Sequence, residues 1–186
     1  MSDHVERLDA ADGYSKIARI FHWGFVVLFA YGVLKQVDDI GQLRDTALLS
    51  FEILFASALL IMLGARFLYM RKTQKTSLPE DTPYAQKIAA KIAHLGMYIS
   101  LATIALSGIL IGLLYWSGFS NGILIDGAVG LHEVSVTVTY WLIAVHVLAA
   151  IYHRFRKDGV WDSMAPFWKE RASFTNNPPA NRNGKR

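Results

Sequence analysis

Long runs of apolar residues with almost no charge constrain this chain more than any other feature. The runs cover residues 20–34, 46–70 and 131–157, and a fourth lies between Lys91 and Asp126, where no charged residue occurs. A helix of about 20 apolar residues is long enough to span a bilayer. The chain is 53% hydrophobic and its mean hydropathy is +0.27. The sequence therefore predicts an all-α membrane protein.

The runs and the polar segments between them predict four membrane-spanning helices, packed as a bundle. We place these helices at 20–34, 46–70, 87–115 and 131–157. The segment SGFSNGILIDGAVG (117–130) is rich in glycine and serine, so we expect it to be a loop. The predicted organisation is a polar N-terminal segment (1–15), a transmembrane domain (16–157) and a C-terminal tail (158–186). In the tail, Trp161 and Trp168 are candidates for contact with the membrane interface.

The basic residues predict how the bundle is oriented. Lysine and arginine gather in the 71–91 segment and after the last helix, whereas the opposite side has only Lys35 and Arg44, offset by acidic residues. Short basic loops stay in the cytoplasm. We therefore expect both termini and the 71–91 loop to be cytoplasmic. The net charge of +4 reflects this orientation, and we do not expect nucleic acid to be a partner.

Three of the six histidines share one face of the last predicted helix. The steps from His132 to His146 and on to His153 return to within roughly 40° and 20° of the same azimuth at 100° per residue. Ionisable side chains inside a bilayer are costly and point to function. Imidazoles from facing helices are ligands for haem iron. Because the chain contains no cysteine, covalent c-type attachment is excluded.

The depth of each histidine suggests how such a site is built. His22, near the start of the first helix, and His146 both fall in the cytoplasmic half, so they are the best pair for one bis-histidine haem. His132 lies toward the periplasm, where a second haem would need a partner on the second helix. Glu52 occupies the matching depth there, and glutamate is an uncommon axial ligand. The second haem is therefore bound by His132 alone, bound unusually, or absent.

Three further residues near the cytoplasmic side have two possible roles each. His94 and His153 either form hydrogen bonds at the interface, which we favour, or contact a quinone or a haem propionate. Arg66 either extends to the lipid headgroups or pairs bidentately with a haem propionate, the role we favour for it.

Four segments match the pattern of a known family. They are YSKIARIFHW around His22, GARFLY around Arg66, IAHLGMY around His94, and GLHEVSVTVTYWLIAVHVLAAIYHRFRKDG, which carries the last three histidines. In these segments the chain resembles the bacterial cytochrome b561 family, including its superoxide oxidase type, and more loosely the cytochrome b subunit of nickel-iron hydrogenases.

The resemblance implies a fold and a set of ligands. It implies four transmembrane helices with two b haems, one near each membrane face, that move electrons between a quinone such as ubiquinone and a second partner. The inner-haem ligands carry over to His22 and His146, and one outer-haem ligand to His132. Where the family has a histidine on the second helix, this chain has Glu52, and the family's HLGH becomes His94-Leu-Gly-Met97.

Three functions follow as hypotheses. The leading one is a membrane b-type cytochrome that transfers electrons between the quinone pool and a membrane or periplasmic redox protein or a larger respiratory complex; whether it is itself an oxidoreductase enzyme is left open. The alternative is an accessory subunit of a respiratory or photosynthetic complex that has lost the outer haem. A superoxide:quinone oxidoreductase ranks third, because acidic outer residues would repel superoxide. These residues are Asp38, Asp39, Asp45, Asp126 and Glu133.

Overall fold

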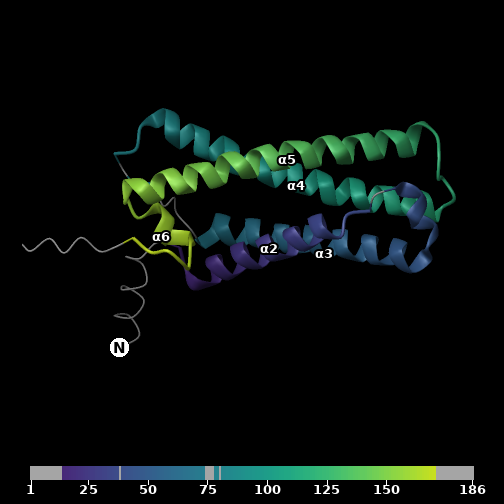
Figure 1. The fold of residues 1–186 in the computed structure, drawn as a ribbon, viewed down its shortest axis with the longest axis horizontal. Helices are drawn as coiled ribbons and strands as arrows, with labels where there is room; N and C mark the ends of the chain where they lie inside the picture. Colours follow the sequence, from purple (N-terminus) through teal and green to yellow (C-terminus); the bar gives the residue numbers. More distant parts are fainter. Residues whose placement is uncertain (1–13, 38, 74–77, 80, 171–186) are drawn as a thin grey trace, which may run out of the picture.

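The computed structural model describes residues 14–37, 39–73, 78–79 and 81–170. Most of the predicted N-terminal segment, Asp38 and the tail from residue 171 onward lie outside these ranges. The elements are α2 (Lys16–Leu34), a 3-10 helix η1 (Ile40–Arg44), α3 (Thr46–Thr73), α4 (Tyr84–Trp116), α5 (Ile123–Arg156) and the short α6 (Val160–Met164) (Figure 1).

The four long helices confirm the predicted membrane bundle. Each of α2, α3, α4 and α5 is long and apolar enough to cross a bilayer. Large apolar side chains on their outer faces are exposed, as expected where lipid replaces water: Ile61 on α3 is 73% exposed and Leu148 on α5 is 65% exposed. We call the end where α2 begins and α5 ends the inner end, after the predicted orientation, and the opposite end the outer end.

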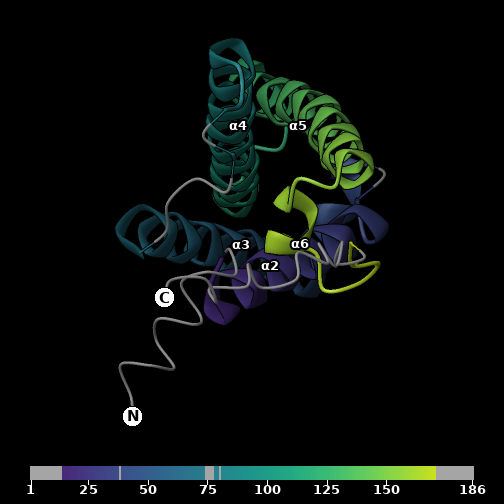
Figure 2. The ribbon, with the colours of Figure 1, turned by 90° about the vertical axis from the view of Figure 1, so that its left-hand side faces the viewer.

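The helices pack as a chain of neighbours. α5 packs along α4, α4 along α3, and α3 along α2, whereas α2 and α5 scarcely touch. Viewed from the end, α4 and α5 lie together above α2 and α3 (Figure 2). The bundle therefore has a loosely packed seam between α2 and α5.

Two clusters of buried side chains hold the bundle together. The cluster nearer the inner end contains Phe25, Leu59, Leu63, Leu101, Ile104 and Ala105. The cluster nearer the outer end contains Leu43, Leu49, Ile111, Ile125 and Ala128. The first cluster joins side chains from three elements and the second from four, so packing between helices, rather than any single helix, stabilises the arrangement.

Two glycines let α3 approach its neighbours. A Cβ atom at Gly32 on α2 would lie 2.8 Å from the ring of Phe55, and one at Gly112 on α4 would clash with Ile53. Side chains of α3 therefore fill the space that these glycines leave, as small residues allow at membrane helix contacts.

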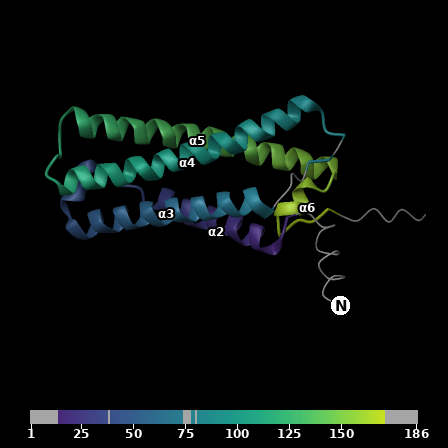
Figure 3. The same cartoon turned by 180° about the vertical axis from the view of Figure 1, so that it is seen from behind.

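The prediction of a loop at 117–130 is wrong for the second half of this segment. Helix α5 begins at Ile123, directly after Gly122, whose φ of 98° suits a glycine. Ile125 and Ala128 are buried against the outer cluster, and this packing outweighs the low helix propensity of the nearby glycines. The connection between α4 and α5 is correspondingly short (Figure 3).

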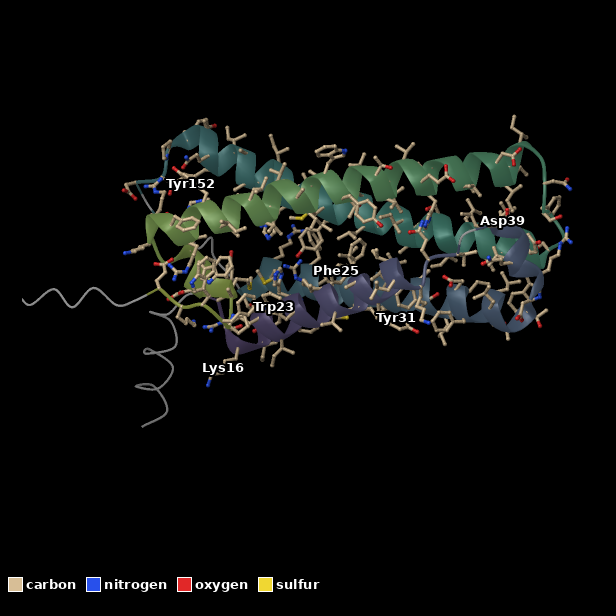
Figure 4. All side chains as sticks on the ribbon, in the orientation of Figure 1. Lys16, Trp23, Phe25, Tyr31, Asp39 and Tyr152 are labelled. Atoms are coloured by element: carbon tan, nitrogen blue, oxygen red, sulfur yellow. The ribbon has the colours of Figure 1, made fainter. Side chains whose placement is uncertain are left out.

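The chain folds back at the inner end after α5. Lys157 and Gly159 adopt left-handed conformations and end the helix. The indole Nε1 of Trp23 on α2 donates a hydrogen bond of 3.0 Å to the carbonyl of Met164. Figure 4 shows Trp23 beside α6 and Phe25 in the interior of the bundle. α6 is thereby attached to the start of α2.

Candidate cofactor site

Three histidine rings meet in the inner half of the bundle. His22 on α2 and His146 on α5 have ring centroids 6.4 Å apart, and His94 on α4 lies 5.2 Å from His146. The side chains of His22 and His146 are partly buried, whereas that of His94 is exposed. The predicted pair therefore faces across the seam between α2 and α5, and His94 joins it from a third helix.

The separation of the predicted pair fits a shared metal ion. Two imidazoles bound to one metal from opposite sides have centroids about 6 Å apart, because a metal–nitrogen bond is about 2 Å long and each ring adds about 1 Å. The 6.4 Å between His22 and His146 matches this value, whereas the 5.2 Å between His94 and His146 is shorter. The donor set and its spacing fit a haem held between α2 and α5.

Arg66 on α3 lies next to these rings. Its Nη1 donates to the hydroxyl of Tyr98 at 3.1 Å, and its Nη2 donates to Nδ1 of His22 at 3.0 Å. The guanidinium also lies over the Tyr98 ring, 5.5 Å from its centroid. Its Nε is buried without a hydrogen-bond partner, and Arg66 forms no ion pair with any described residue. A partly buried cation with a free N–H suits an anion such as a propionate.

The contact with Arg66 sets the tautomer of His22. A guanidinium only donates hydrogen bonds, so Nδ1 of His22 accepts and the neutral ring carries its hydrogen on Nε2. A ring that binds iron through Nε2 must carry its hydrogen on Nδ1 instead. Iron ligation by His22 Nε2 and this contact with Arg66 therefore exclude each other, and ligation frees the guanidinium for another acceptor.

His153 lies apart from the inner cluster. Its Nδ1 is 2.7 Å from Oδ2 of Asp158, beyond the end of α5, and Arg156 Nε lies 3.6 Å from the same oxygen. The pair joins the last turn of α5 to the segment that leads to α6. The partner of His153 is thus a carboxylate of the C-terminal tail.

A cavity of about 270 Å³ occupies the outer half, between α2, α3, α4 and α5. His132 from α5 and Glu52 from α3 both line it, so the residues predicted to share one depth also share one space. Helix α5 starts at Ile123, so His132 lies about 14 Å along the helix axis from the first residue of α5. It is therefore deeper in the bundle than its predicted place at the helix end.

Ser107 on α4 sets the tautomer of His132. The Ser107 hydroxyl lies 2.6 Å from the carbonyl of Thr103 and 3.0 Å from Nδ1 of His132. Its one hydrogen goes to the carbonyl, so its oxygen accepts a hydrogen bond from Nδ1 of His132. The lone pair of the imidazole is then on Nε2, the nitrogen left for a ligand.

The outer cavity does not fit a bis-imidazole haem. His132 is the one imidazole that the described residues contribute to it. A glycine on a helix can let a flat macrocycle approach closely. Here the side chain of Phe55 occupies the space beside Gly32, and that of Ile53 occupies the space beside Gly112.

Two residues of these sites were missed in the sequence. Tyr98 follows His94 by four residues and lies on the same helix face, so helical periodicity offered a signal. Ser107 offered none, because its partner His132 is on another helix.

A family model described as prokaryotic cytochrome b561 matches residues 13–167. Comparison with curated proteins gave no match, and comparison with solved structures gave none.

Proposed function

The chain belongs to the prokaryotic cytochrome b561 family of membrane b-type cytochromes that transfer electrons, and we propose that His22 and His146 hold its haem. We further propose that the electrons pass between the quinone pool and a redox partner, which is a membrane or periplasmic protein or a larger respiratory complex. In this proposal the protein lies in the bacterial inner membrane with both termini in the cytoplasm.

One observation carries the assignment of the ligands: the two rings come from helices that scarcely touch, yet their centroids are 6.4 Å apart. When bound, haem b supplies an iron that takes up and releases one electron. Two imidazole ligands leave the iron no open coordination position, which favours electron transfer over oxygen binding. The apolar cluster that contains Phe25 and Leu101 is proposed to lower the polarity of the surroundings and so to influence the potential.

Arg66 is proposed to orient the cofactor. Its unpaired Nε and the Nη2 that now faces His22 would together present two N–H groups to one carboxylate. His94, next to His146, is proposed to contact the edge of the cofactor or a quinone rather than the iron. No cofactor contact is proposed for His153, because Asp158 holds its Nδ1.

The test is a pyridine haemochrome assay against protein concentration, with absorption spectra of the oxidised and reduced protein. We expect a ratio near one haem per chain and a six-coordinate, low-spin spectrum. Preparations that contain no haem, or a high-spin spectrum alone, would contradict the proposal.

A second candidate is an accessory subunit of a larger respiratory or photosynthetic complex. The observation that favours it is the single described imidazole at the outer cavity, since one haem near the inner end does not by itself carry electrons across the bilayer. Purification under mild detergent decides between the candidates. Stable association with a large complex supports the accessory role, whereas quinone-linked electron transfer by the isolated protein supports the first candidate.

A further inference from the structure

We propose that the outer cavity binds the head group of a benzoquinol, with His132 and Glu52 as the acceptors of its two O–H groups. This inference rests on the proposed function, in which quinone is the membrane electron carrier, and it names the site for that carrier. The residues of the cavity do not fit a second bis-imidazole haem. In this proposal the cavity holds an electron carrier from the lipid phase instead.

The size of the cavity favours a single ring over a porphyrin. Pockets for drug-sized ligands measure roughly 300–1,000 Å³, and this cavity of about 270 Å³ lies below that range. A porphyrin with its substituents is several times larger than a benzoquinone ring. Phe55 and Ile53 close the approaches at Gly32 and Gly112, so a haem would require both side chains to move.

The polar groups of the cavity suit a ligand whose oxygen atoms donate hydrogen bonds. The contact with Ser107 leaves the lone pair of His132 on Nε2, and this nitrogen can accept a quinol O–H. The partly buried Glu52 has no hydrogen-bond or ion-pair partner among the described residues. These two groups come from different helices, α5 and α3, and the rest of the lining is mainly apolar.

The cavity also has a route to the lipid. Val33 on α2 and Tyr140 on α5 both line it, and their exposed fractions are 38% and 42%. They lie on the two helices that scarcely touch, so the cavity opens at the seam. An isoprenoid tail attached to the ring would leave the bundle there and enter the bilayer.

The position of the cavity connects it to the inner site. Leu59, Ile104 and Ala105 belong to the buried cluster of the inner half and also line the cavity. Oxidation of a bound quinol breaks its two O–H bonds and yields a quinone, two protons and two electrons. The protons pass to Nε2 of His132 and to the Glu52 carboxylate. The two electrons would leave one at a time toward the haem proposed to be held by His22 and His146, and the redox partner of the proposed function would re-oxidise this haem after each transfer.

The test is equilibrium binding of a decyl-tailed benzoquinol, kept reduced under anaerobic conditions, to the purified full-length protein in nanodiscs. Each of His132→Leu and Glu52→Leu removes one hydrogen bond, so we expect the Kd to rise about tenfold in each variant. Gly108→Leu adds a side chain toward His132, whose Cε1 is 3.5 Å from the Cβ position, and should abolish binding. Gly130→Leu is the matched control, because nothing lies within 4 Å of its Cβ position, and it should bind the probe as the wild type does.

Haem content is measured on the same samples and separates this inference from the proposed function. We expect the ratio to remain near one in all four variants. A ratio near two that falls to one in His132→Leu would place haem in the cavity and overturn the inference, while the inner haem survives. An unchanged Kd in His132→Leu, Glu52→Leu and Gly108→Leu would also overturn it. If the wild-type protein contains no haem, the proposed function is contradicted. The binding measurements on the variants still show whether the cavity binds the probe.

Discussion

His22 and His146 bring their imidazole rings to a centroid separation of 6.4 Å across the seam between α2 and α5. Their helices are neighbours in space but have little direct packing, so this pair spans the least filled side of the bundle. The relationship gives the chain a two-imidazole donor set from the first and last membrane helices. It is the basis for the predictions about haem below.

Substitution of either ring should remove the haem. His22→Ala and His146→Ala each remove one of the two imidazoles proposed to hold the iron. We expect the haem-to-protein ratio to fall from near one to below about a tenth, since ligand loss costs several kcal/mol of binding. The pyridine haemochrome assay measures this ratio. His153→Ala is the control, because its Nδ1 faces Asp158, and it should keep its haem. Full haem content in both of the first two variants would refute the assignment.

Removal of the Arg66 guanidinium should loosen the haem without displacing its iron ligands. Arg66→Leu deletes the proposed partner of a propionate, and a charge-assisted hydrogen bond contributes about 1.5–3 kcal/mol. We expect haem to transfer to excess apomyoglobin at least about tenfold faster, with the low-spin spectrum retained. The haem transfer rate of Arg66→Lys should lie between those of the wild type and Arg66→Leu, because an ammonium keeps the charge but lacks the planar pair of N–H donors.

The control for this experiment is Arg71→Leu, which removes a guanidinium from an exposed position at the end of the same helix. Its haem transfer rate should equal that of the wild type. Equal rates for Arg66→Leu and Arg71→Leu would show that the Arg66 guanidinium does not hold the cofactor.

A large side chain at Gly32 should destabilise the bundle. The ring of Phe55 already occupies the space beside it, and overpacking of this kind costs about 1–3 kcal/mol. We expect Gly32→Leu to lower the Tm in detergent. Gly127→Leu gains the same helix propensity at a position with nothing within 4 Å of its Cβ, so its Tm should be equal or higher. A Tm for Gly32→Leu equal to that of Gly127→Leu would argue against close packing at Gly32.

The orientation of the bundle can be tested with single cysteines, because the natural chain has none. Arg44→Cys at the outer end should react with a membrane-impermeant maleimide in spheroplasts. Arg71→Cys at the inner end should react only after the membrane is permeabilised. Both positions are exposed, so reactivity reports the side of the membrane rather than burial. The reverse pattern would invert the predicted topology.

Much of the fold was predictable because membrane insertion depends on local properties. A span is recognised by the hydropathy of its own residues, so all four helices were found without knowledge of their neighbours. Helical periodicity likewise placed His132, His146 and His153 along one face of one helix. The segment before His132 was misread because Ile125 and Ala128 form helix through burial against other elements.

The sequence by itself determined the number of spans, the family and the histidines that merit attention. Only the tertiary structure decided which groups meet: His94 beside His146, Arg66 between His22 and Tyr98, Ser107 behind His132, and Glu52 in the same cavity as His132. The physical reason is that a membrane helix is apolar on every side, so its pattern does not say which face turns inward. That rotation is set by how side chains of neighbouring helices pack.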